Sequence, residues 1–522
     1  MAGSPDIVIV GSGINALVAA ALLGKKGRRV LVLERNDRPG GCMRTEEIAP
    51  GFLADLMAAT FVLFRVSPGY AQLAGDLERH GFVMADSPHP TAVLRPDGSA
   101  AVLTMDRAAN VAALEALAPG DGAAFAAGAD AVGANADLVF ALLGQGLWTR
   151  KTAMLLARTA WKRGPRALAA FFGEALGTAR HWLEAEFTSD TSRALFAPWV
   201  LHTGLGPESA YSAEMARVIA FSLEAAGAPI SVGGAERLPQ AFAALIAEQG
   251  GQVRTNADVA HIIVENGTAR GVELADGERI FAAQVVASVT PDQLYGRLLD
   301  APSENARTET RKYRYGKGNF QLHYALDRPP DWTTPGLEKV ALIHLTPGLD
   351  GVSKAANEAE RGMLPETPTI CVGQPTALDP SRAPEGKAVL WLQLPEAPRH
   401  IKGDAAGVMD TPADGQWTDS LREAYADRVE SILCNHINGF RDSVVARRAL
   451  SPADLQALNM NLVGGDPYGG FCGLDQFFVW RPFKTSVNHA TEVANLWHIG
   501  ASTHPGPGLG GGSGALIAQR LG

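Results

Sequence analysis

The sequence predicts an α/β fold whose opening stretch is a βαβ unit, and three observations indicate it. Residues 6–10 (DIVIV) form a short apolar run of the kind found in buried strands. A glycine-rich turn at 11–16 (GSGINA) follows at once and leads into a helical segment that extends to residue 26. Residues 29–34 (RVLVLE) then form a second apolar strand that ends on an acid.

The residues of this turn meet the needs of a bound dinucleotide. Gly11 permits the tight turn out of the strand, and Gly13 has no Cβ, so a diphosphate can come close to the backbone. Ala16, in place of a third glycine, keeps the helix near the sheet. The free N–H groups and the dipole at the helix start favour an anion. Glu34 lies roughly 20 residues beyond the turn, where an acid accepts hydrogen bonds from ribose hydroxyls. The alternative is a glycine turn in an ordinary βα unit.

The residues after Glu34 distinguish between kinds of dinucleotide. Residues 35–45 (RNDRPGGCMRT) resemble the R-x-G-G-x-x-(S/T) continuation of flavoproteins in the amine oxidase and phytoene desaturase superfamily. In that superfamily the paired glycines, here Gly40 and Gly41, run along the FAD diphosphate and ribityl chain. The sequence is most similar to the phytoene desaturase-related branch of carotene desaturases, carotenoid isomerases and pyridine nucleotide-disulphide oxidoreductase-domain proteins. Cys42 stands where that family commonly has arginine.

Two later segments carry the same resemblance. Residues 229–291 are similar to the second FAD-domain segment, in which a valine lies along the adenine, and Val259 is predicted for that position. Residues 500–514 (GASTHPGPGLGGGSG) resemble the G-A-x-T-H-P-G-x-G element of carotene desaturases. This element precedes a short helix, whose N–H groups we expect to face the flavin pyrimidine.

The resemblance implies a discontinuous, glutathione reductase-like, Rossmann-type FAD-binding domain formed by residues 1–85, 229–291 and 489–522. An α+β substrate domain is expected in two parts, a mainly helical cap at 86–228 and a sheet-containing part at 292–488. Residues 318–326 and 388–393 alternate like strands of a half-exposed sheet. The residues predicted to bind FAD are Gly11, Gly13, Ile14, Asn15, Ala16, Glu34, Arg35, Gly40, Gly41, Cys42, Arg44, Thr45, Val259, Gly500, Ala501, Gly508, Leu509 and Gly510.

Composition and short motifs limit which partners are expected and in which cellular compartment the protein is expected. A net charge of −9 indicates no nucleic-acid partner. The four cysteines include no C-x-x-C pair, which favours reduced thiols and no zinc site, and no metal-ligand spacing is evident. No signal peptide and no apolar run of roughly 18 residues is found, so a cytoplasmic protein is expected.

One segment qualifies that expectation. Residues 148–172 are basic and aromatic, which is typical of a helix that contacts a membrane surface. A solvated helix face or a contact in a homo-oligomer is the alternative, and the acidic net charge favours it.

The resemblance implies an FAD-dependent oxidoreductase that removes hydride from a hydrophobic small molecule by desaturation or oxidation. Because a nicotinamide site is not evident, electrons are expected to pass to oxygen, a quinone or another acceptor. His504, His202 and Tyr468 are candidate catalytic residues, in that order, and Gln476 and Arg481 are polar candidates near the isoalloxazine edge.

Two other functions stay open. One is a flavin-dependent isomerase of the carotenoid type, without net redox change. The other is a lipid- or prenyl-binding module on the same fold, which predicts a damaged nucleotide motif, whereas this one is intact.

Overall fold

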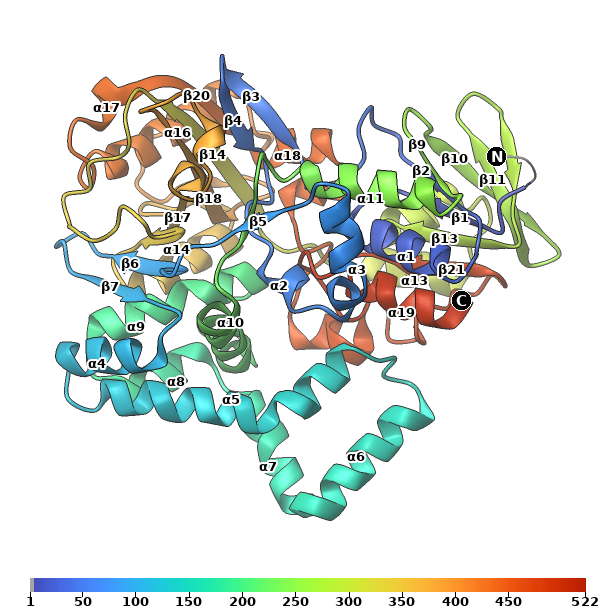
Figure 1. Cartoon of the computed structure of the whole chain (residues 1–522), viewed down its shortest axis with the longest axis horizontal. Helices are drawn as coiled ribbons and strands as arrows, with labels where there is room; N and C mark the ends of the chain where they lie inside the picture. The colour runs from blue at the N-terminus through green and yellow to red at the C-terminus, as the bar shows by residue number, and fades with distance from the viewer. Residues whose placement is uncertain (1–3) are drawn as a thin grey trace.

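The computed structural model describes residues 4–522 and contains two sheet-based units with a group of helices beside them. In Figure 1 the nucleotide-binding strands lie on the right and the larger sheet lies on the left. Helices of the 107–226 stretch occupy the lower part of the view.

The first unit is built on a parallel five-stranded sheet with the order β21-β13-β1-β2-β9. Its strands are β1 (Ile7–Val10), β2 (Val30–Leu33), β9 (Gln252–Arg254), β13 (Gln284–Ser288) and β21 (Leu496–Ile499). Three distant stretches of the chain therefore meet in one sheet, in the α/β arrangement that the sequence predicts.

Alternate strand residues pack on opposite faces of this sheet. Ile7 and Ile9 of β1 pack with four helices, and Val8 and Val10 pack with a small antiparallel sheet. The helices are α1 (Ile14–Gly24), α3 (Pro68–Arg79), α11 (Arg237–Glu248) and α19 (Gly512–Leu521). The small sheet consists of β10 (Val259–Glu265), β11 (Thr268–Leu274) and β12 (Arg279–Phe281).

The sequence also predicts continuous strands at 253–259 and 281–288, and the structure divides each of them. The predicted strand 253–259 ends at Arg254 because the chain leaves the parallel sheet at Asn256, whose φ is +51°, and enters the small sheet at Val259. The predicted strand 281–288 divides between β12 and β13 for the same reason, since each part pairs in a different sheet.

The second unit is built on a seven-stranded sheet with the order β20-β14-β18-β17-β15-β6-β7. Its strands are β6 (Thr91–Leu94), β7 (Ala100–Leu103), β14 (Gly318–Leu326), β15 (Leu342–Leu345), β17 (Ile370–Gly373), β18 (Ala388–Ala397) and β20 (Val444–Leu450). The prediction that β14 is half exposed is wrong, because all nine of its residues are buried. Its apolar face packs with α16 (Asp419–Leu433), and Asn319 and Gln321 on its polar face line a cavity.

The helical part connects the two units. Phe125 of α5 stacks near Phe221 of α10 and Phe196 of α9, which anchors the first half of α5. Helices α6 and α7 project from the rest of the molecule in Figure 1, and most of their side chains are exposed. The helices are α4 (Arg107–Leu117), α5 (Asp121–Leu143), α6 (Arg150–Arg163), α7 (Pro165–Ala175), α8 (Ala179–Glu186), α9 (Asp190–Phe196) and α10 (Ser212–Ala226).

Helix α5 corrects one expectation from the sequence. By length and composition it could cross a membrane, since an 18-residue window has a mean hydropathy of 1.3 and only 11% of that window is buried. The apolar pattern of this stretch is weak because alanine supplies much of the hydropathy, and Asp130 and Asp137 interrupt the apolar residues.

The remaining elements are short. The helices are α2 (Val62–Arg65), α12 (Pro291–Gln293), α13 (Glu304–Lys312), α14 (Leu349–Glu360), α15 (Pro375–Leu378), α17 (Phe440–Ser443) and α18 (Pro452–Leu458). The strands are β3 (Thr45–Ala49), β4 (Phe52–Asp55), β5 (Met84–Ala85), β8 (Ile230–Ser231), β16 (Met363–Leu364) and β19 (Gly403–Asp404). The 3₁₀ segments are η1 (Ala197–Thr203), η3 (Pro380–Arg382), η4 (Val463–Gly465), η5 (Leu474–Gln476) and η6 (Phe478–Trp480), and η2 (Leu294–Leu298) is a π-helical segment.

Candidate cofactor and substrate site

A cavity of about 910 Å³ lies between the two units. One wall is formed by the glycine turn after β1 and by the glycine-rich loop before α19, and the opposite wall is formed by β14 and β18. Ligand pockets commonly measure roughly 300–1,000 Å³, so this cavity is at the large end of that range. It is continuous from the nucleotide motif to the seven-stranded sheet.

Two helices begin at this cavity with free backbone N–H groups. Gly13 precedes α1 and Gly511 precedes α19, and neither helix start is capped by a side chain. The helices pack so closely that a Cβ on Gly514 would lie 1.9 Å from the carbonyl oxygen of Asn15. Their amino ends therefore lie side by side, and their N–H groups and dipoles suit an anion such as a diphosphate.

Glycine is needed at two positions of this site because neighbouring backbone atoms leave little room for a Cβ. Gly11 has a φ of +86°, and a Cβ there would lie 3.0 Å from the Ser288 carbonyl oxygen. Gly41 has a φ of +62°, and a Cβ there would lie 3.3 Å from the Cα of Gly13. A Cβ on Gly13 would meet nothing within 4 Å, so this position faces open space in the cavity. These residues fit a dinucleotide laid across the turn.

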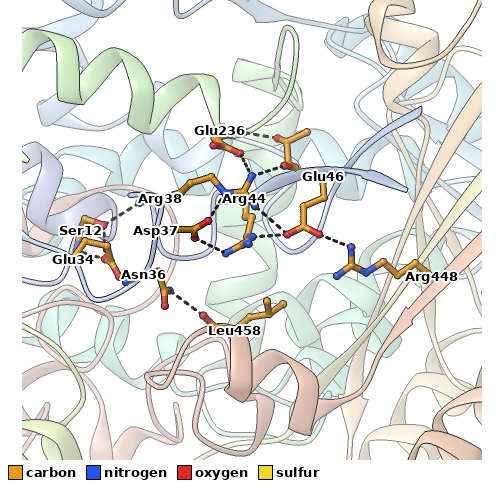
Figure 2. A network of polar contacts seen from close by, with 12 residues as sticks. Ser12, Glu34, Asn36, Asp37, Arg38, Arg44, Glu46, Glu236, Arg448 and Leu458 are labelled. Atoms are coloured by element: carbon orange, nitrogen blue, oxygen red, sulfur yellow. Dashed lines mark hydrogen bonds and ion pairs between the residues drawn. The ribbon is translucent and has the colours of Figure 1, made fainter. Parts of the chain in front are cut away.

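Glu34 connects the two glycine segments. Its Oε2 accepts hydrogen bonds from the Ser12 amide at 3.0 Å and from Ser12 Oγ at 2.5 Å. Ser12 Oγ accepts in turn from the amide of Gly40 at 3.0 Å (Figure 2). The Glu34 side chain is buried yet lines the cavity, where its remaining lone pairs can accept from a ribose.

Most of the residues predicted to bind FAD line this cavity, although their contacts with the cofactor stay predictions. These residues are Gly11, Gly13, Ile14, Asn15, Glu34, Arg35, Gly40, Gly41, Cys42, Val259, Gly500, Ala501, Gly508, Leu509 and Gly510.

Ala16, Arg44 and Thr45 do not line the cavity, so their predicted contact with FAD gains no support from its surface. Ala16 is fully buried between helix and sheet, where a small residue is needed for packing. Arg44 Nε donates to Glu46 Oε1 at 2.7 Å, inside a charged network that reaches Arg448 of β20 (Figure 2). Thr45 Oγ1 donates to the carboxylate of Asp55 at 2.6 Å. The motif ends here in contacts between the two units rather than in cofactor contacts.

A histidine pair lies beside the sheet at the other end of the cavity. His202 of η1 lines the cavity, and its Nε2 lies 2.9 Å from Nε2 of His344 on β15. Burial lowers the pKa of His202 to about 4 and that of His344 well below its ordinary value, so both rings are neutral at pH 7.

Cys371 of β17 completes a cluster with this pair, and one ligand atom from each of the three residues lies within 4.8 Å of the others. Sequence spacing did not indicate this cluster, because its members come from separate segments that meet only in the fold. Burial raises the pKa of the Cys371 thiol, so the thiol is protonated at pH 7.

The other two candidate catalytic residues are placed differently. Tyr468 lines the cavity, but its hydroxyl already donates to the Leu201 carbonyl at 2.6 Å, and burial raises its pKa well above the ordinary value. His504 does not line the main cavity. It lies in a separate pocket of about 30 Å³, with Nε2 3.2 Å from the Gln145 carbonyl oxygen. The order of the predicted candidates, with His504 first, therefore finds no support in the geometry.

Gln476 and Arg481 brace the loops around the cavity. Gln476 Oε1 accepts from the Arg314 amide at 2.9 Å, and its Nε2 donates to the Arg314 carbonyl at 2.8 Å. Arg481 is buried and donates to the carbonyl oxygens of Tyr468 at 2.5 Å and Ala501 at 2.9 Å. Both side chains are used in contacts within the chain.

The rest of the cavity surface was not identified from the sequence. Its apolar part is formed by residues from the end of α5, from α7 and from α10: Val139, Phe140, Leu142, Leu143, Phe171, Phe172, Met215, Val218 and Ile219. Its polar part lies on the seven-stranded sheet and includes Asn319, Gln321 and Gln393. Their alternation along the strand was the available signal.

Comparisons with known proteins agree with this architecture. The model of the flavin containing amine oxidoreductase family matches residues 17–426. The chain is 28% identical to the mouse pyridine nucleotide-disulfide oxidoreductase domain-containing protein 2, over 98% of this chain and 92% of that protein. It is also 28% identical to the zeta-carotene-forming phytoene desaturase of Myxococcus xanthus, over 99% of this chain and 92% of that protein. A limonene dehydrogenase component of Castellaniella defragrans is 26% identical over 99% and 95%.

Solved structures show the same fold at lower identity. An oxidoreductase from Methanosarcina mazei superposes with a TM-score of 0.63 at 16% identity, over 99% of this chain and all of that one. Putrescine oxidase superposes with a TM-score of 0.62 at 14% identity, over 99% and 98%. The family match covers most of the sequence, and the glycine turns and paired helix starts fit the cofactor of that family. The chain therefore belongs to the flavin containing amine oxidoreductase family and is an FAD-dependent oxidoreductase.

Proposed function

We propose that this enzyme removes hydride from a hydrophobic small molecule and passes the electrons to oxygen, a quinone or another acceptor. The observation that carries the proposal is the continuity of the cavity, which joins the nucleotide motif to a chamber with largely apolar walls. By their names, two of the relatives act on phytoene and limonene, which are hydrocarbons.

The protein's own residues have distinct parts in this proposal. The turns at Gly11–Gly13 and Gly40–Gly41 and the starts of α1 and α19 would hold FAD, which supplies the hydride acceptor when bound. The apolar side chains of α5, α7 and α10 hold the substrate and exclude water. The neutral imidazole of His202 can accept a proton where a substrate releases one.

Anaerobic mixing with candidate substrates tests the proposal. A substrate should bleach the absorbance of the oxidised flavin, and admission of oxygen or a quinone should restore it. Polyenes, terpenes, apolar alcohols and amines form the panel. If the enzyme changes a polyene only after its flavin has been reduced, and consumes no acceptor, it is an isomerase and the hydride-removal proposal fails.

We further propose a cytoplasmic enzyme that contacts a membrane surface through α6 and α7. Trp161 is 91% exposed and Met154 is 65% exposed, a large apolar surface on a helix that also carries exposed Arg158 and Lys162. Basic helices with exposed aromatic residues suit an anionic lipid interface. The same helical region supplies Phe171 and Phe172 to the cavity wall, so a lipid-dissolved substrate would meet the cavity near the bilayer.

A further inference from the structure

The polar face of the seven-stranded sheet forms the floor of the cavity. Gln321 on β14 lies directly opposite Gln393 on β18 in the antiparallel register. The neighbouring residues Phe320, Leu322 and Leu392 point the other way into the core under α16. Because strand side chains alternate, Asn319 lies on the same face as Gln321, and all three carboxamides line the cavity.

Two of these carboxamides, those of Asn319 and Gln321, are buried and have an unsatisfied oxygen. Gln321 is 1% exposed and Asn319 is 2% exposed. Within residues 4–522, Oε1 of Gln321 and Oδ1 of Asn319 have no hydrogen-bond partner. Buried polar atoms are nearly always hydrogen-bonded in folded proteins, so two orphaned oxygens on one cavity wall indicate that a ligand supplies the partner.

The charges around the cavity limit what that ligand can be. Among the described residues that line it, the cationic ones are Arg35 and Arg297. Both lie next to Met460, at 3.1 Å and 3.8 Å from its Sδ, and Arg297 also donates to the Val259 carbonyl. They therefore belong to the end of the cavity predicted to hold the adenosine, and a substrate carboxylate on the sheet floor would lack a cationic partner.

A cationic head is equally unsuited to this floor. Glu34 lies in the nucleotide motif, and Asp258 lies beside Arg297. Glu214 at the start of α10 is the other acid that lines the described cavity. Desolvation raises the pKa of its carboxyl, and the nearby guanidinium of Arg217 offsets its charge. An ammonium group would therefore gain little compensation for its lost hydration.

We propose that Asn319, Gln321 and Gln393 form a subsite for an uncharged hydroxyl or carbonyl group at one end of an otherwise apolar substrate. A carboxamide both donates and accepts, so it can pair with either group. The apolar body of the substrate would then extend along α5, α7 and α10. This inference rests on the proposed function, since it names the class of substrate that the same cavity takes.

Binding to the FAD-loaded enzyme tests this subsite without requiring turnover. The probes are dodecanol, dodecane, dodecylamine and dodecanoate, which share one chain and differ in the head, and the readout is the perturbation of the flavin absorbance. We expect dodecanol to bind about tenfold more tightly than the other three, because it alone offers a neutral donor and acceptor. Equal affinity of dodecanol and dodecane, or a preference for the amine or the carboxylate, would overturn the proposal.

The variant Gln321→Leu tests whether the tighter binding of dodecanol arises from the carboxamides of the seven-stranded sheet. It should remove about tenfold of the affinity for dodecanol and leave dodecane binding and FAD content unchanged. Gln240→Leu, an exposed amide on α11, is the matched control and should behave as the wild type. Loss of FAD from Gln321→Leu, in protein whose melting temperature is unchanged, would show that the amide serves the cofactor and would overturn the proposal.

If Gln321→Leu does not fold, the same loss of dodecanol affinity is expected of Gln393→Leu, on the paired strand β18. Failure of the proposed function would be distinguishable from failure of the subsite. In that case the enzyme would still bind dodecanol more tightly, but no candidate substrate would reduce its flavin.

Discussion

His202 and His344 share one hydrogen bond between their Nε2 atoms, which lie 2.9 Å apart. Trp199 packs against both rings, with ring centroids 4.8 Å from each. One histidine must be the donor and the other the acceptor, so the pair holds opposite tautomers and keeps the cavity-facing ring in place.

From this geometry, we expect His202→Asn to slow substrate-dependent flavin reduction by about 10²-fold, the lower end of the range for general acid–base groups. FAD content should be normal, since His202 pairs with His344 of the seven-stranded sheet, whereas the glycine turns adjoin the parallel sheet. His436→Asn is the matched control, because His436 is also buried but does not line the cavity. Stopped-flow absorbance measures the rate of flavin reduction in both variants. An unchanged rate in His202→Asn would show that His202 is not the proton acceptor.

Gly41→Ala should lower FAD occupancy by tenfold or more. The added methyl group would be directed at the Gly13 Cα from 3.3 Å and would press the paired-glycine loop away from the turn. Gly27→Ala is the control, because Gly27 has a similar positive φ of +77° but open space around its Cβ. Both substitutions carry the backbone cost of roughly 1–2 kcal/mol for a left-handed residue. The ratio of flavin to protein absorbance after purification separates the two effects, and equal ratios would contradict the assignment.

Arg382→Met should destabilise the fold by about 3–5 kcal/mol, the usual cost of breaking a buried ion pair. Arg382 is fully buried and pairs with Asp55, which is 3% exposed, and it also donates to the Ser231 carbonyl at 3.2 Å. The pair links β4 to the segment before β18, so its loss leaves Asp55 charged and buried. Urea unfolding measures the change, with Arg79→Met, an exposed ion-pair residue, as the control. A cost below about 1 kcal/mol, the level of a surface pair, would contradict this.

The sequence predicts the nucleotide-binding unit well because its requirements are local. Gly11 has a positive φ, Gly13 faces the cavity without a side chain, and Glu34 follows the second strand, and each of these positions can be recognised from a few neighbouring residues. The motif does not indicate the contacts that Arg44 and Thr45 make within the chain. In the fold, Arg448 of strand β20 donates a hydrogen bond to Glu46 beside these residues, and nothing within the motif indicates this contact.

The substrate end was harder to predict because periodicity distinguishes the faces of a strand without saying what each face meets. Gln321 alternates with apolar neighbours as a solvent-facing residue would, yet it is buried and lines the cavity. His344 and Cys371 become partners only through the pairing of β15 with β17. His504 is next to the flavin-associated loop in sequence, but the direction of its side chain depends on packing with Gln145 from the helical part.

Removing basic charge from α6 should weaken membrane binding. Each basic residue near an anionic surface contributes about 1 kcal/mol, or roughly fivefold in affinity, so Arg158→Gln with Lys162→Gln should lower vesicle binding by about 25-fold. Trp161→Ala should weaken it further. Arg307→Gln with Lys312→Gln on α13 removes the same charge from another exposed helix and should have little effect. Co-sedimentation with phosphatidylserine vesicles at low and high salt measures binding, and equal losses from both double variants would indicate non-specific attraction.

His504→Gln should flatten the pH dependence of stability. Burial lowers the pKa of His504 to about 4, against about 6.5 for an exposed histidine. Between these values the unfolded chain binds a proton that the folded chain does not, so stability is complete above about pH 6.5 and is lost as the pH falls. By about pH 5 this single group should have removed about 2 kcal/mol from the wild type, and the glutamine variant has no such group.

The measurement is the melting temperature of both proteins at about pH 7.5 and about pH 5, since the other titrating groups are common to both and cancel in the comparison. The variant should start lower, because it gives up the packing of the ring and its contact with the Gln145 carbonyl. It should then lose fewer degrees than the wild type on acidification. A larger loss in the variant would mean that His504 is protonated in the folded protein and stabilises it in that form, which would also restore it as a candidate acid.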